Sequence, residues 1–325
     1  MSRRHLLQSA ACVAAIATLG VLPAFAQEAN WPTRPLRIIV PFGAGSGNDS
    51  VARLIGNHLS RAFGQPVVID NVAGANGTIG ATAAARAAPD GYTLFVTTNT
   101  TQAAAPSLMK KINYDPIKDF APIGRIANTA ALLVVNPALP VNNIAELIAL
   151  AKSRPGKLTY ASGSAGSLVP AAMLASMAEI DMLHVPYKSI PLGLTDVMGG
   201  QVDMMFTDMA TGTPQVKSGK VRAIGVSSLK ASPVLPSVPP IAQTLKGFEL
   251  LAWYAMYAPA RTPSPVIERL NREIQTAVAS PEIQEKLTVM GLQPVTSSPQ
   301  ELADFSRSEL AKWTRLIKQA GIQAE

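Results

Sequence analysis

Two short loops in the sequence carry residue types that bind anions. The loop at residues 42–46 (FGAGS) follows an apolar run at 36–40 and precedes a helical pattern, and the loop at 162–167 (SGSAGS) repeats that arrangement. A helix N-terminus presents unpaired backbone N–H groups and the positive end of the helix dipole. Glycines allow a ligand to approach that backbone closely. Each loop therefore predicts a site for a small anion such as a carboxylate.

Two other chemistries fit these loops less well. A dinucleotide fingerprint needs a third glycine where Asn48 or Ser50 stands, and Pro41 and Phe42 put a rigid, bulky pair at the turn. A hydrolase elbow needs G-x-S-x-G, which the second loop does not match. A periplasmic serine hydrolase acting on a carboxylic ester through Ser164 or Ser167 stays as the alternative to an anion receptor.

Composition excludes several kinds of site. The only cysteine is Cys12, and His58 and His184 are the histidines that follow residue 26. We expect no disulfide, no metal and no cofactor. The net charge is +7, but the Lys and Arg residues are scattered rather than grouped. This distribution predicts attraction of small anions and no nucleic-acid partner.

The first 26 residues have the features of an export signal. Arg3 and Arg4 precede the apolar run 10–22, and residues 24–26 (AFA) form a cleavage site. We expect cleavage of residues 1–26 and a periplasmic protein, exported by either the Sec or the twin-arginine route. No later apolar run is long enough to predict a membrane span.

Apolar runs alternate with helical periodicity along the chain, which predicts an α/β fold with mixed, mostly parallel sheets. Asn48 or Asp49 is expected to cap the first helix, and Glu309 and Lys312 are expected on a solvated helix face. Strands are expected at 36–40, 65–70, 92–98, 130–137, 157–162, 182–187, 202–206, 221–228 and 251–259. Helices are expected at 48–63, 79–88, 144–153, 169–178, 192–198, 265–280 and 299–320.

Nine segments in order give the chain a resemblance to a known family. They are WPTRPLRIIVPFGAGSGND, GQPVVIDNVAGANGTIGA, APDGYTLFV, YDPIKDFAPIGRIA, PGKLTYASGSAGS, HVPYKS, GGQVDMMF, SGKVRAIGVSS and APARTPSPVIERLN. The chain resembles the extracytoplasmic solute receptors of tripartite tricarboxylate transporters, the Bug proteins. The resemblance implies a two-domain periplasmic binding protein, type II-like, with a hinged cleft. Domain 1 would hold 27–130 and 255–325, and domain 2 would hold 131–254.

The resemblance also implies a function and a set of ligand-binding residues. Such a receptor is monomeric, is not an enzyme, and delivers a small carboxylate to the permease subunits of the transporter or to a sensor kinase. Thr207 stands where an aspartate is frequent, which favours a mono- or dicarboxylate without an amine; an aromatic dicarboxylate such as terephthalate also fits. The expected ligand-binding residues are Phe42, Gly43, Ala44, Gly45, Ser46, Asn76, Thr98, Asn99, Ser162, Gly163, Ser164, Ala165, Gly166, Ser167 and Asp208.

Overall fold

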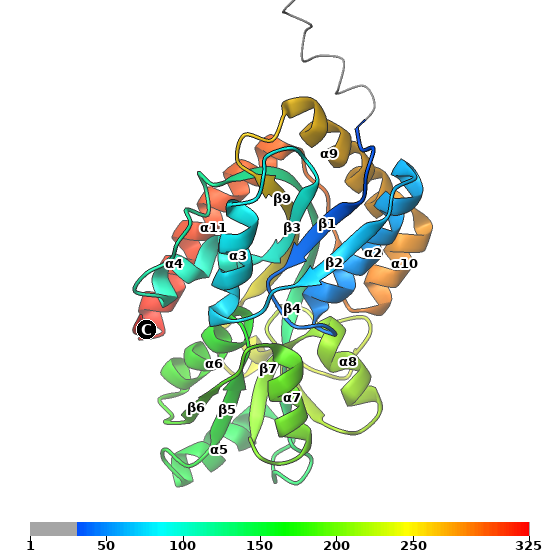
Figure 1. Ribbon diagram of the computed structural model, residues 1–325. Helices are drawn as coiled ribbons and strands as arrows, with labels where there is room; N and C mark the ends of the chain where they lie inside the picture. Colours follow the sequence, from blue (N-terminus) through cyan, green and yellow to red (C-terminus); the bar gives the residue numbers. More distant parts are fainter. Residues whose placement is uncertain (1–30, 325) are drawn as a thin grey trace, which may run out of the picture. The chain divides into compact units, whose positions relative to one another are not determined.

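The computed structural model describes residues 31–324, and the chain from Arg34 onward forms one compact unit (Figure 1). The signal peptide expected at 1–26 lies outside the described residues. The strands are β1 (Leu36–Val40), β2 (Val67–Asn71), β3 (Thr93–Thr98), β4 (Phe120–Val135), β5 (Thr159–Ser162), β6 (Leu183–Pro186), β7 (Met204–Asp208), β8 (Arg222–Val226), β9 (Leu251–Pro259) and β10 (Gln293–Pro294). The α-helices are α2 (Gly47–Phe63), α3 (Thr78–Ala85), α4 (Ala105–Leu108), α5 (Ile144–Ser153), α6 (Ala165–Ala178), α7 (Ile190–Met198), α8 (Met209–Lys217), α9 (Ser264–Ala279), α10 (Pro281–Val289) and α11 (Pro299–Gln319). Shorter helical turns are η3 (Ala75–Gly77), η4 (Thr100–Ala104) and η5 (Ile241–Gln243).

The strands pair in the order β2-β1-β3-β9-β4-β7-β5-β6, with β8 and β10 also paired to β4. The pairs β1–β2, β1–β3, β5–β6 and β5–β7 are parallel, whereas β3–β9, β4–β9 and β4–β7 are antiparallel. The expected mixed α/β architecture is confirmed. We call the part built on β1, β2, β3 and β9 the first half, and the part built on β5, β6 and β7 the second half.

The long strand β4 belongs to both halves. From Phe120 to Ala130 it pairs with β9, and from Ala131 to Val135 it pairs with β7. Figure 1 shows α2, α3, α9, α10 and α11 beside the strands of the first half, and α5 to α8 beside those of the second. Parallel strands end at the same edge of a sheet. The loops after β1 and β3 therefore lie at one edge of the first half, and the loops after β5 and β7 lie at one edge of the second half.

Most predicted elements exist, and the differences are local. The sequence patterns did not predict the first ten residues of β4, nor α4, α8 and α10. The expectation that Glu309 is solvated was wrong, since only 5% of it is exposed. Its Oε2 accepts hydrogen bonds from Trp253 Nε1 and Trp313 Nε1, each at 2.9 Å. Within residues 31–324, no helix is both long and apolar enough to cross a bilayer.

Candidate functional site

The first loop joins β1 to the N-terminus of α2. Gly45 has φ +79°, a left-handed conformation that glycine adopts without strain. Ser46 is the N-cap, and its Oγ accepts a hydrogen bond from Asp49 N at 3.3 Å. The expectation that Asn48 or Asp49 caps this helix was wrong, because the helix already begins at Gly47.

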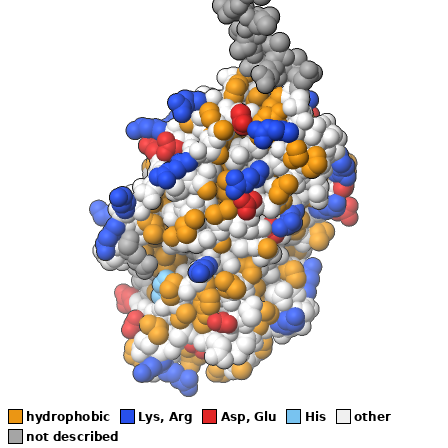
Figure 2. Space-filling model, in the orientation of Figure 1, with side chains coloured by type: hydrophobic (Ala, Val, Ile, Leu, Met, Phe, Trp, Pro, Cys, Tyr) orange, Lys and Arg blue, Asp and Glu red, His pale blue; other side chains and the backbone are white. Residues whose placement is uncertain are grey.

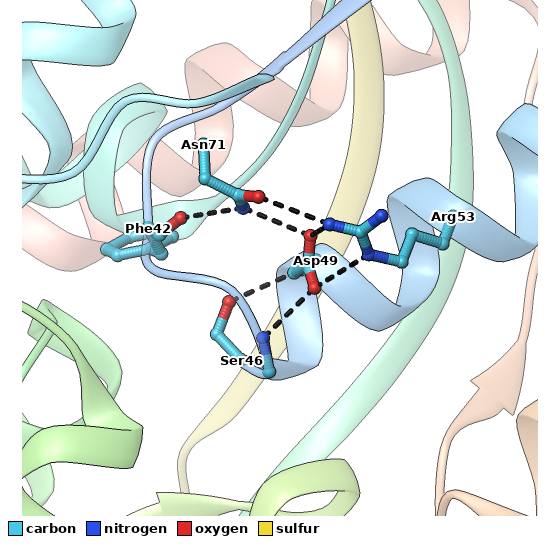
Figure 3. A network of polar contacts seen from close by, with 6 residues as sticks. Phe42, Ser46, Asp49, Arg53 and Asn71 are labelled. Carbon is cyan, nitrogen blue, oxygen red and sulfur yellow. Dashed lines mark hydrogen bonds and ion pairs between the residues drawn. The ribbon is translucent and has the colours of Figure 1, made fainter. Parts of the chain in front are cut away.

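Asp49 instead holds the loop in shape (Figure 3). Its carboxylate accepts hydrogen bonds from Gly45 N, Arg53 Nε and Asn71 Nδ2, each at 3.0 Å. Asn71 also donates to the Phe42 carbonyl at 3.0 Å, so strand β2 braces both ends of the loop. Burial opposes ionisation of Asp49, but the bonds from Arg53, Gly45 and Asn71 outweigh it and hold the pKa below its usual value.

The second loop joins β5 to the N-terminus of α6. Ser164 is the N-cap of α6, and Ser167 completes a capping box with it. Ser167 Oγ accepts from Gly163 N at 2.9 Å and from Ser164 N at 3.1 Å, and donates to the Ser164 carbonyl. The helix expected from residue 169 therefore begins four residues earlier, at Ala165.

Both helix N-termini line one cavity of about 40 Å³, which we call the central cavity. Its walls come from the loop after β1, the starts of α2, α6 and α7, the end of β3 with the residues that follow it, the middle of β4, the end of β7 and the first part of β9. The predicted site residues that line it are Phe42, Ser46, Thr98, Asn99, Ser164, Gly166 and Asp208. Among the described lining residues there is no Lys or Arg, so neutral donors would have to hold an anion there.

The other predicted site residues lie around or beyond this cavity. Gly43, Ala44, Gly45, Gly163, Ala165 and Ser167 belong to the two loops but are absent from its described lining. Asn76 and Ser162 line a neighbouring cavity of about 270 Å³, together with His184 and Lys188. There Ser162 Oγ lies 2.6 Å from His184 Nε2. The role of all these residues in ligand binding stays a prediction.

Asp208 brings the second half against the N-terminus of α2. It caps α8, accepting from Thr211 N at 2.9 Å and from Thr211 Oγ1 at 2.8 Å. Its carboxyl also meets the N–H of Gly47, the first residue of α2. Burial raises the pKa of Asp208, although the hydrogen bonds from Thr211 and Gly47 oppose that rise. Burial and the nearby Asp208 also raise the pKa of Tyr254.

Two buried amides in the central cavity each have an unpaired polar atom. Asn48 is 3% exposed, and its Nδ2 donates to the Val96 carbonyl at 2.9 Å while its Oδ1 has no partner. Asn99 is 1% exposed, and its Nδ2 has no partner. A buried polar atom without a hydrogen bond costs stability, so each of these two atoms calls for a partner such as a water molecule or a ligand.

Several residues that line the central cavity were not predicted from the sequence. Thr129 lies in the part of β4 that was not expected to be a strand, and Tyr254 lies on β9, far from either loop in sequence. Thr129 is a polar residue inside an apolar run, which is the one signal that could have drawn attention to it. Glycine and serine content pointed to the loops and gave no information on the strands opposite them.

Two observations on the described residues concern other kinds of site. Within residues 31–324 no group of three or more His, Cys, Asp or Glu residues could hold a metal ion. On the face in Figure 2, Lys and Arg side chains lie singly among acidic and apolar ones, without a continuous basic stripe.

Residues 51–322 match the family described as tripartite tricarboxylate transporter family receptor. The chain belongs to this family. Among solved structures it is similar to periplasmic binding protein BugD, with 35% identity, a TM-score of 0.87 and coverage of 91% of this chain and 100% of that one. It is also similar to R. palustris Rpa4515 with adipate, with 33% identity, a TM-score of 0.89 and the same coverages. The third is MatC from Rhodopseudomonas palustris with bound malate, with 32% identity, a TM-score of 0.84 and coverage of 88% and 100%. Members of the family are solute-binding receptors, and the two-domain architecture of these periplasmic binding proteins is also that of this chain.

Proposed function

We propose that this receptor works in the periplasm, captures a small organic carboxylate in the central cavity, and delivers it to the membrane subunits of a tripartite tricarboxylate transporter or to a sensor kinase. One observation carries the proposal. The N-termini of α2 and α6, one from each half, line the same cavity beside the unpaired Asn99 Nδ2. Amide N–H groups at helix N-termini bind carboxylates without a fixed cation. The adipate of Rpa4515 and the malate of MatC support this class of ligand.

The size of the cavity favours a short aliphatic acid. Its volume is about 40 Å³, whereas an engineered protein cavity that binds benzene measures about 150 Å³. An aromatic dicarboxylate such as terephthalate would need the cavity to widen substantially. A mono- or dicarboxylate of a few carbons is therefore our preferred ligand.

Binding would work by a shift in population between open and closed forms. A ligand that touches α2 and α6 together makes its full set of contacts only when the two halves are close. We propose that the domains are 27–130 with 255–325, and 131–254, and that the receptor is monomeric. Support for the boundary comes from β4, which changes its pairing partner between Ala130 and Ala131. We also propose cleavage after residue 26 following export by the Sec or twin-arginine route.

We propose no catalytic role for the serines of the second loop. Ser167 Oγ accepts from Gly163 N and Ser164 N and donates to the Ser164 carbonyl, all at the N-terminus of α6. His184, which a serine hydrolase would need beside Ser164 or Ser167, has its Nε2 against Ser162 instead. These contacts count against Ser164 and Ser167 as the nucleophiles of an esterase.

A ligand panel tests this function. Purified protein is heated at pH 7 with acetate, propionate, succinate, malate, adipate or terephthalate, and hydrolysis of p-nitrophenyl acetate is followed in parallel. A ligand at about 100 times its Kd adds about 2.7 kcal/mol of stability, which corresponds to a rise in Tm of about 4 °C for a chain of this length. We expect a short aliphatic acid to give this shift and the ester to survive. Ester turnover that is lost on replacing Ser164 or Ser167, with no Tm shift from any acid, would favour the hydrolase.

A further inference from the structure

The turn that follows β3 forms part of the wall of the central cavity. Thr98 at the end of β3, and Asn99 and Thr100 after it, all line the cavity. The chain continues as η4, a π-helical turn in which the Ala105 N–H bonds to the carbonyl of Thr100. Such turns are rare and occur frequently at functional sites. Whatever holds η4 in this conformation therefore affects the shape of the binding site.

A proline leaves one carbonyl of η4 without its backbone donor. If the π pattern continued, the Thr101 carbonyl would accept from the N–H of residue 106, but that residue is Pro106 and has none. Thr101 is fully buried, so its carbonyl needs a partner inside the protein. The Tyr114 hydroxyl donates to it at 2.7 Å. Burial raises the pKa of Tyr114, so the hydroxyl keeps the proton that it donates.

Tyr114 comes from a segment between α4 and β4 that is itself held in shape. Directly after it, Asp115 Oδ1 accepts from Lys118 N at 3.0 Å, which closes a turn. A second bond joins this segment to η4, since Gln102 Nε2 donates to the Pro116 carbonyl at 3.2 Å. The segment therefore contacts η4 through two hydrogen bonds, and the bond from Tyr114 supplies the donor that the backbone lacks.

We propose that Tyr114 is a positioning residue for solute binding, which holds η4 as a π turn and so fixes the wall residues just before it. Tyr114 is not among the described residues that line the cavity, but its bond is to Thr101, the neighbour of the lining residue Thr100. Without the hydroxyl, the Thr101 carbonyl would be buried without a partner, and η4 would shift to regain one. The inference rests on the proposed receptor function and adds to it a residue outside the cavity.

Two matched phenylalanine variants test the inference. Tyr114→Phe removes the hydroxyl and keeps the ring, which packs edge-on against Phe120. Tyr257→Phe is the control, since its buried ring also packs edge-on against Phe120 but its hydroxyl bonds to Ser306 of α11. Calorimetry at pH 7 measures the binding of succinate, malate and adipate, and urea unfolding measures stability. We expect similar losses of stability, about 10-fold weaker binding by Tyr114→Phe, and binding by Tyr257→Phe within about twofold of the unchanged protein.

Coupling to the cavity wall distinguishes positioning from a general structural role. In a protein that already carries Asn99→Ala, the further change Tyr114→Phe should weaken binding by no more than about threefold, because a side chain that it positions is gone. A general loss of stability would give the same 10-fold effect with and without Asn99→Ala. Crystal structures should also show the backbone at Thr98, Asn99 and Thr100 displaced in Tyr114→Phe and unmoved in Tyr257→Phe.

Equal losses of affinity in Tyr114→Phe and Tyr257→Phe, or the full 10-fold loss on top of Asn99→Ala, would overturn the inference and leave the receptor function intact. If none of the three acids binds the unchanged protein, the receptor function fails. The crystal structures then decide on Tyr114, and an unmoved wall in Tyr114→Phe would overturn its role. If Tyr114→Phe does not fold, Gln102→Met removes the other bond to η4 and replaces it in each test, with the same expected results.

Discussion

Replacing Gly47 with alanine should weaken solute binding by about 100-fold, or about 2.7 kcal/mol. Gly47 is the first residue of α2, and it lies against Asp208 of the second half and Tyr254 of β9. A Cβ there would overlap the Asp208 carboxylate and would lie 2.6 Å from Tyr254 Oη, so the two elements would have to move apart. The ligand is proposed to bind between these elements. If they cannot approach each other fully, a smaller fraction of the protein is in the closed form that binds the ligand. Calorimetry with the acid that gives the largest Tm shift measures the effect.

The change should leave the fold of each half intact, because the closest overlap is with Asp208 of the other half and is relieved when the halves move apart. Gly199→Ala is the matched control: that glycine follows α7, and a Cβ there would meet nothing closer than 3.5 Å. The control should keep the affinity of the unchanged protein. If Gly47→Ala binds the acid with an affinity within about threefold of that of the unchanged protein, contact at the start of α2 does not govern closure.

Glu309→Leu should lower the free energy of unfolding by about 2–4 kcal/mol. The single oxygen Glu309 Oε2 accepts hydrogen bonds from Trp253 on β9 and Trp313 on α11, and both indoles are buried. Leucine would leave two N–H donors without partners inside the first half. Lys312 Nζ, 3.1 Å from Glu309 Oε1, would also lose its partner, but this ion pair is partly exposed and contributes little.

Glu309→Gln is the informative comparison because glutamine keeps an oxygen that can accept from both indoles. It should lose no more than about 1 kcal/mol, and urea unfolding followed by tryptophan fluorescence measures both variants. Equal stability of the Leu and Gln variants would show that apolar packing holds α11 to β9 and that the shared acceptor is unimportant.

The strand-loop-helix units could be predicted from sequence because each is local. Apolar runs and helical periodicity lie within about 30 residues, and glycine and serine mark the turns between them. The helix starts were harder to predict. The choice among Ser46, Asn48 and Asp49 as cap depends on which side chain reaches which amide, and several neighbouring residues of the right type compete.

Features that depend on distant partners could not be predicted. Glu309 lies three residues from Lys312 on a charged helix, and its burial depends on the approach of Trp253 from strand β9. Similarly, Thr129 and Tyr254 reach the central cavity because β4 and β9 run side by side, with Ala127 opposite Tyr254. A single sequence does not show which strands pair, so the two loops were predicted as site residues but the lining residues of β4 and β9 were not.

A crystal structure of the receptor with its tightest-binding carboxylate tests the central claim most directly. The account predicts that the carboxylate lies in the central cavity, within hydrogen-bond distance of Asn99 Nδ2 and of backbone amides at the start of α2 or α6, with no Lys or Arg in contact. A carboxylate found instead in the neighbouring cavity, paired with Lys188 or His184, would contradict it.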